Sequence, residues 1–130
     1  MSPLPTPSVV LFVADVPCMT HFYQTVASMA LVSQDSDHAI LELAGVELVI
    51  HALRGEPQVL PLPDGHVRIR EDSYVKVCLP VQSIADARSK VAALGGALQP
   101  SAKEWQARGF RACDGHDPEG NVWQARTSAA

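Results

Sequence analysis

The sequence predicts an α+β fold built from two βαβββ modules, and three observations predict it. Two β-branched runs, residues 9–16 (VVLFVADV) and 74–81 (YVKVCLPV), are each followed at once by a segment with helical periodicity. Three extended segments follow each helical segment. The two halves also match at an offset of 65 residues, which is half of the 130-residue chain.

The first helix follows residues 9–16. Asp15 stands where it can cap the helix ahead of Val16 and Pro17, and proline is well tolerated in a first turn. Apolar side chains then recur at spacings of three and four, so one face must cover a sheet. That face comprises Met19, Phe22, Tyr23, Val26, Met29 and Ala30.

The second helix begins at a capping box formed by Ser83 and Asp86. It ends at Gly95 and Gly96, because glycine adopts the left-handed conformation of a helix stop at little cost. Its apolar face comprises Ile84, Ala87, Val91 and Leu94.

Extended segments complete each module. They span residues 31–34, 38–44 and 46–53 in the first half and 97–99, 107–114 and 121–126 in the second, with tight turns at 44–45 and 117–120. We therefore expect a single domain with module 1 at about 8–53, a connector at 54–72 rich in proline, glycine and charge, and module 2 at about 73–127. One βαβββ unit leaves a face of its sheet uncovered, so two such curved sheets predict a cup-shaped cavity.

Composition excludes several classes of function. The formal net charge is −4 and the basic residues are scattered, which argues against a nucleic-acid partner. The longest apolar runs have the length of strands, and the N-terminus does not resemble a signal peptide, so we expect no membrane association. Three widely spaced cysteines indicate reduced thiols in a cytoplasmic protein.

Three segments give the chain a family resemblance. The first strand ends in V-A-D-V, the aromatic pair Phe22 and Tyr23 follows on the helix, and D-P-E-G-N at 117–121 leads into the last strand. In these segments the chain resembles the vicinal oxygen chelate superfamily, which includes glyoxalase I, extradiol dioxygenases and bleomycin resistance proteins. The resemblance covers about residues 8–126 and implies a glyoxalase-like curved mixed sheet, often completed in a homodimer.

In enzymes of this superfamily a divalent metal lies in the cup, held by residues on the first and last strands of the modules. The resemblance carries those positions onto Ser8 (or Val9), His51, Tyr74 and Gln124. Segments 48–51 and 121–124 also align with each other at an offset of 73 residues, which supports the second and fourth positions independently.

The residues at these positions are poor ligands for a dication. They offer a hydroxyl, an imidazole, a phenol and a carboxamide, with no carboxylate to offset the charge. We therefore expect no cofactor; if a metal binds, His51 and Gln124 would hold Ni, Zn, Mn or Fe. His51 is either a hydrogen-bonded strand residue or a polar group that orients a ligand or moves a proton.

Three further residues bear on the cup. Trp105 either stacks on a planar ligand at the rim or packs over the sheet edge, and Arg111 either meets an anionic ligand or contacts a partner subunit. Strand alternation places Trp123 on the face opposite Gln124, under a helix. The predicted ligand-binding cup thus comprises Ser8, His51, Tyr74, Gln124, Trp105 and Arg111, with no catalytic residue assigned.

Two functions compete. The first is a metal-free protein that binds a small organic molecule, a drug or metabolite, as in bleomycin-type antibiotic resistance. The alternative is a metal-dependent lyase, isomerase, transferase or dioxygenase with non-standard ligands, so whether the chain is an enzyme stays open. A third interpretation, an interaction module, would require a large exposed apolar face without an enclosed cavity.

Overall fold

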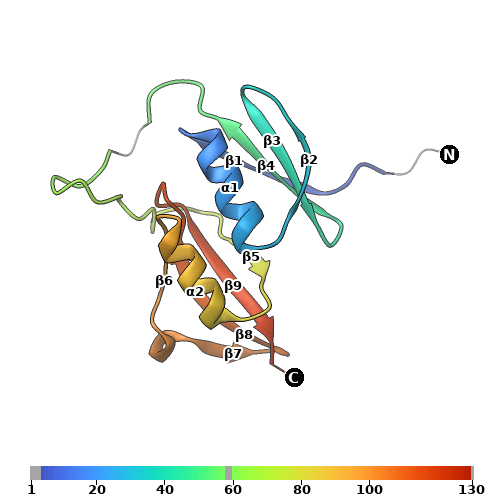
Figure 1. Ribbon diagram of the computed structural model, residues 1–130, viewed down its shortest axis with the longest axis vertical. Coiled ribbons are helices and arrows are strands. Elements are labelled where there is room, and N and C mark those ends of the chain that lie inside the picture. The colour runs from blue at the N-terminus through green and yellow to red at the C-terminus, as the bar shows by residue number, and fades with distance from the viewer. Residues whose placement is uncertain (1–3, 58–59, 130) are drawn as a thin grey trace. The chain divides into compact units, whose positions relative to one another are not determined.

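The computed structural model describes residues 4–57 and 60–129, so residues 58 and 59 of the expected connector lie outside the described residues. The chain divides into two compact units, Met1–Pro57 and Gln58–Ala130, each of which is described by itself. Figure 1 shows that each unit carries one helix against one sheet. No helix among the described residues is long and apolar enough to cross a membrane.

The first unit has the predicted βαβββ order. Its elements are β1 (Ser8–Val13), α1 (Val16–Val26), β2 (Ala30–Gln34), β3 (His38–Leu43) and β4 (Val46–Ala52). The strands lie in the order β1-β4-β3-β2, with β1 parallel to β4 and the other pairs antiparallel.

The second unit repeats this topology and adds one strand, β7. Its elements are β5 (Val77–Pro80), α2 (Ile84–Ala93), β6 (Ala97–Leu98), the short 3₁₀ helix η1 (Ser101–Lys103), β7 (Trp105–Ala107), β8 (Phe110–His116) and β9 (Val122–Ser128). The strand order is β5-β9-β8-β6, and β7 pairs with β8. The predicted α+β class and the repeated βαβββ order with mixed sheets are confirmed.

Both helices begin at the predicted caps. The Asp15 carboxylate accepts a hydrogen bond from the backbone N–H of Cys18 at 3.0 Å, and the Ser83 hydroxyl accepts one from the N–H of Asp86 at 3.1 Å. The helix faces that cover the sheets are also as predicted. They bury Met19, Phe22, Tyr23 and Val26 in α1 and Ile84, Ala87 and Val91 in α2.

Some predicted boundaries are wrong. α1 ends at Val26 because Ser28 adopts a left-handed conformation (φ 53°), so Ala30 begins β2 instead of extending the helix face. β5 begins at Val77, three residues later than predicted, because the Ser73 hydroxyl bonds the backbone of Val75 in a local turn. The predicted strand 107–114 is a hairpin, since Gly109 (φ 77°) forms the turn between β7 and β8.

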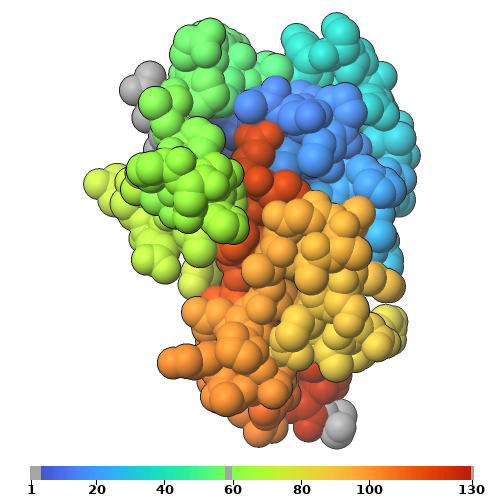
Figure 2. Space-filling view, turned by 60° about the vertical axis from the view of Figure 1, so that its left-hand side comes forward, coloured from blue at the N-terminus to red at the C-terminus, as the bar shows by residue number. Residues whose placement is uncertain are grey.

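The connector packs on the turn between β8 and β9. The backbone N–H of Arg70 donates to the carbonyl of Gly120 at 2.7 Å, and a Cβ at Gly120 would lie only 2.1 Å from the Arg68 carbonyl oxygen. In Figure 2 the yellow-green connector lies against the orange-red part of the chain. The glycine of the D-P-E-G-N segment is therefore required by close backbone contact as well as by its positive φ of 86°.

Candidate functional site

The open face of the second sheet carries a row of bonded polar side chains. Asp114 on β8 is paired with Gln124 on β9, and the Gln124 amide nitrogen donates to the Asp114 carboxylate at 2.9 Å. Lys76 donates to the same carboxylate oxygen at 3.0 Å. The Arg126 Nε donates to the Gln124 amide oxygen at 2.6 Å. The row Lys76–Asp114–Gln124–Arg126 is what we call the polar row.

The other face of this sheet is the one that α2 covers. Trp123 and Ala125 alternate with the polar row along β9 and are fully buried. Arg88 on α2 donates to the Cys113 sulfur, which also lies on this face. Trp123 is therefore buried on the face opposite Gln124, as the alternation predicted.

The carboxyl of Asp114 is held ionised by its partners. Partial burial is the largest single effect and would raise its pKa. Hydrogen bonds from Gln124 and Lys76, the charge of Lys76 and a hydrogen bond from Trp105 together outweigh it and lower the pKa below its ordinary value of 3.8. The polar row thus carries a fixed negative charge between two fixed positive ones.

A cavity of about 650 Å³ opens beside the polar row within the second unit. Its walls come from the connector (residues 69 and 71), from the segment that precedes β5 (73–76), from β6 and the following loop (97–100), from β8 (114–116) and from Val122. Most of these side chains are apolar or small. Lys76, Asp114 and His116 bring charge and hydrogen-bonding groups to the wall, which is the composition of a ligand pocket.

His116 has a defined tautomer when neutral. Its Nδ1 lies 2.9 Å from the backbone carbonyl oxygen of Asp117, and a carbonyl only accepts hydrogen bonds, so Nδ1 carries the proton. The Nε2 atom of the neutral ring is therefore an acceptor. No local sequence signal distinguishes His116 from the other histidines, because its position in the cavity depends on the pairing of β8 with β6 and β9.

The predicted cup residues Ser8 and His51 both belong to the first unit. Ser8 is exposed at the start of β1, and His51 is half-buried near the end of β4. The His51 Nδ1 bonds the carbonyl of Ala52 at 2.8 Å, and its ring stacks at 6.0 Å on that of His38. Phe12 contacts the same imidazole edge-on, with ring centroids 5.6 Å apart.

The four predicted cup residues of the second unit are placed differently from one another. Gln124 is buried in the polar row, and Tyr74 is fully exposed before β5 but lines the cavity. Trp105 is 41% exposed at the start of β7. Arg111 lies three residues before Asp114 on β8, hence on the α2-covered face, where it pairs with Glu104. The structure therefore does not bring Arg111 to the polar row.

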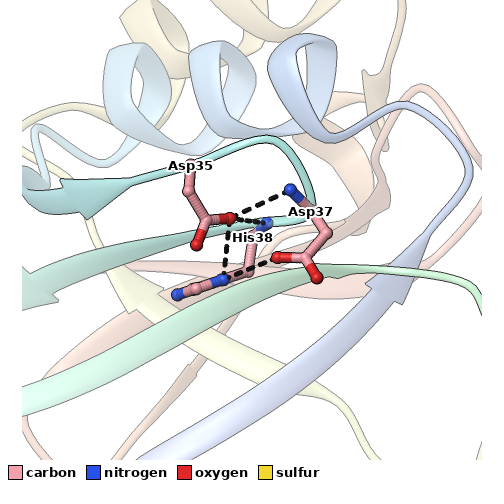
Figure 3. Close-up of side chains that lie close together, drawn as sticks. All are labelled: Asp35, Asp37 and His38. Carbon is pink, nitrogen blue, oxygen red and sulfur yellow. Dashed lines mark hydrogen bonds and ion pairs between the residues drawn. The ribbon is translucent and has the colours of Figure 1, made fainter.

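One cluster in the first unit has the composition of a metal site. Asp35, Asp37 and His38 place their ligand atoms within 4.8 Å of one another (Figure 3). The same contacts close the turn before β3, because Asp35 accepts from the backbone N–H groups of Asp37 and His38. These bonds lower the pKa of Asp35, and the hydrogen bond that His38 Nδ1 donates to the Asp37 carboxylate raises the pKa of His38. The hydrogen bonds and ion pairs of this turn therefore explain why the three side chains lie close together.

Comparison with solved structures identifies the fold, whereas no family model and no curated protein matches the sequence. A glyoxalase/bleomycin resistance protein/dioxygenase family enzyme from Burkholderia phytofirmans superposes with a TM-score of 0.68 at 13% identity, covering 96% of this chain and 99% of that one. The fosfomycin resistance protein FosX from Listeria monocytogenes, in complex with Mn(II) and sulfate, gives 0.66 at 17% identity over 99% and 93%. An integron cassette protein from V. cholerae gives 0.63 at 24% identity over 98% and 97%.

The chain has the vicinal oxygen chelate fold. The first two of these neighbours are members of that superfamily, as the sequence resemblance predicted. Because every identity is below 25%, the likeness concerns the fold, and the site must be interpreted from this chain's own residues.

The metal that the vicinal oxygen chelate fold implies does not suit these residues. The only ligand atom of Gln124, its amide oxygen, accepts a hydrogen bond from the Arg126 guanidinium, whose charge repels a dication. Tyr74 lies before β5, so it is not held on the strand that would direct its side chain toward a metal. None of the four positions carries a carboxylate.

Proposed function

We propose that this protein binds a small organic molecule without a metal, with the cavity of the second unit as its site. One observation carries the proposal: a cavity of about 650 Å³ beside a fixed polar row. Pockets for drug-sized ligands commonly span roughly 300–1,000 Å³ and combine apolar walls with a few well-placed polar groups. Ile69, Leu98 and Val122 supply apolar wall here.

The polar groups of the cavity define what a ligand must offer. The Lys76 ammonium uses one of its three protons on Asp114 and keeps donors for a ligand acceptor. The His116 Nε2 accepts from a ligand donor when the ring is neutral. A metabolite or antibiotic with a hydroxyl or amine next to an acceptor group satisfies both, and a role in drug resistance fits this proposal, since FosX is a fosfomycin resistance protein.

Metal independence is part of the proposal because the Arg126 guanidinium already supplies positive charge at Gln124.

A second candidate, an enzyme dependent on Ni, Zn, Mn or Fe, is favoured by one observation. The Nδ1 of His51 donates to the Ala52 carbonyl, which leaves Nε2 of the neutral ring with a lone pair, as in metal-bound histidines. A single imidazole is a weak basis for a metal site, so we favour binding without metal.

We also propose a cytoplasmic homodimer. On the open face of the first sheet, Val10 and Phe12 are 48% and 49% exposed, and a second subunit would remove this apolar area from water. None of Cys18, Cys78 and Cys113 is disulfide-bonded, which suits a reducing compartment. Light scattering on the wild type and on Phe12→Glu tests the dimer: loss of dimer only in the variant supports it, and a monomeric wild type refutes it.

The test of the binding site is a thermal-shift screen of metabolites and antibiotics, fosfomycin and bleomycin included, on metal-stripped protein. Ligands that raise Tm are then measured by calorimetry on two variants. Val75→Trp fills the cavity from an exposed position (63%), and Val32→Trp makes the same change at a similarly exposed site on β2 (57%). Binding lost in Val75→Trp alone supports the proposal, whereas equal affinity in both variants, or binding only after metal is restored, overturns it.

A further inference from the structure

A second cluster on the open face of the second sheet combines two arginines with two aromatic rings. The guanidinium carbon of Arg126 lies 4.3 Å from the Phe110 ring centroid, and that of Arg108 lies 5.2 Å from it. Trp105 contacts Phe110 edge-on, with centroids 5.9 Å apart. The Phe110 ring therefore contacts two positive groups.

This cluster is centred on Phe110, at the end of β8 opposite the cavity. Phe110 pairs with Ser128 at one end of the β8–β9 ladder, whereas His116 and Val122, which line the cavity, pair at the other end. Phe110 is thus separated from these cavity residues by the length of β8. Arg126 also belongs to the polar row and Trp105 bonds Asp114, so the cluster adjoins the site of the proposed function on the same sheet face.

Unlike Arg70, Arg88 and Arg111, the two guanidinium groups have no acidic partner among the described residues of this unit. Arg88 and Arg111 both pair with Glu104. Within residues 60–129, no carboxylate lies within ion-pair distance of Arg108 or Arg126, although the whole chain carries a net charge of −4. Arg126 uses Nε on Gln124, which leaves its terminal nitrogens as donors.

A guanidinium that stacks on a ring keeps its N–H edge directed away from that ring, and stacking fixes its orientation before a ligand arrives. An oxyanion that meets such an edge accepts charge-assisted hydrogen bonds from it. The Trp105 ring, 41% exposed, adds an apolar surface next to them. The cluster thus offers guanidinium donors for the charged group and an aromatic ring for the planar part of an aromatic or otherwise planar anion.

We propose that Arg108 and Arg126 bind the carboxylate or phosphate group of a small organic anion, with Trp105 packing against its planar part. The assignment needs no metal and no catalytic step. Carboxylate and phosphate share the chemistry that a guanidinium fork recognises, and the experiment distinguishes them.

The test titrates benzoate, phenyl phosphate, inorganic phosphate and neutral benzamide at constant ionic strength. Arginine Nε–H signals in NMR spectra and Trp105 fluorescence report binding. We expect saturable changes with at least one organic anion, weaker binding of inorganic phosphate and none of benzamide. Arg108→Gln should weaken the anion about tenfold or more, the factor expected for one charge-assisted hydrogen bond, with unchanged Tm because Arg108 is exposed.

Lys103→Gln is the control, because Lys103 is an exposed cation of the same unit outside the cluster. Arg126→Lys keeps the charge and removes the planar fork, and should also weaken binding. Three results would each overturn the proposal: equal weakening in Arg108→Gln and Lys103→Gln, non-saturating shifts for every anion, or benzamide binding as tightly as benzoate. The tighter of benzoate and phenyl phosphate identifies the anion class.

Discussion

The Arg126 Nε donates to the amide oxygen of Gln124 over 2.6 Å, and Gln124 is only 5% exposed. This bond pairs the Gln124 side chain, on the central strand β9, with a cation of the protein itself. It therefore decides how the position expected to face a metal is used here, and it links the polar row to the arginine cluster.

The first prediction concerns metals. We expect Mn²⁺, Ni²⁺, Zn²⁺ and Fe²⁺ to leave the Tm of chelator-treated protein unchanged, because the Arg126 guanidinium at Gln124 repels a dication. An ion that bound selectively to the folded state would raise the Tm. Differential scanning fluorimetry with Mg²⁺ as the reference ion checks this. A concentration-dependent rise in Tm that His51→Ala abolishes would favour the metal-dependent enzyme instead.

A second prediction concerns Gly120 and uses Gly65 as its control. Both glycines have nearly the same positive φ, 86° and 87°, so alanine carries a similar backbone strain at each, about 1 kcal/mol. Only at Gly120 does the new Cβ collide with the Arg68 carbonyl, whereas nothing lies within 4 Å at Gly65. We expect Gly120→Ala to lose about 1–3 kcal/mol more unfolding free energy in urea than Gly65→Ala. Equal losses would show that the connector does not pack as described.

A third prediction concerns pH. The hydrogen bonds from Arg111 and Arg88 lower the pKa of Glu104 below its ordinary value of 4.5. Since the folded-state pKa is the lower one, this pairing stabilises the protein above the unfolded-state pKa and is lost as the pH falls through the folded-state value. We expect Glu104→Gln to cost about 1–3 kcal/mol at neutral pH and much less in acid. Urea unfolding across pH, with exposed Glu56→Gln as the control, measures it; a cost independent of pH would contradict the assignment.

A fourth prediction concerns the turn at Asp117. Its fully buried carboxylate accepts from the backbone N–H groups of Glu119 and Asn121 at 2.9 and 3.0 Å, and from the Asn121 amide. Asp117→Ala leaves these donors unpaired, and we expect a loss of about 3 kcal/mol. Asp64 makes a similar bond to His66 in an exposed turn, so Asp64→Ala should cost under about 1 kcal/mol. Similar unfolding free energies for the two variants would refute this account.

The sequence by itself determined the α+β class, the repeated βαβββ order, both helix caps and the buried helix faces. These features depend on local signals, such as the Asp15 and Ser83 caps and the apolar spacing from Met19 to Val26. Such signals lie within a few residues of one another, so the sequence displays them directly. The burial of Trp123 opposite Gln124 follows from the period of a strand for the same reason.

Only the tertiary structure decided which polar groups meet. Lys76 reaches Asp114 across 38 residues, and the β8–β9 register brings Asp114 beside Gln124 and Arg126 near Phe110. Arg111 was expected at the cup, yet the hairpin turn at Gly109 and the pairing of β8 place it on the α2 face. A shift of one residue in strand register reverses every side chain, and register is fixed by packing and long-range hydrogen bonds that no local pattern records.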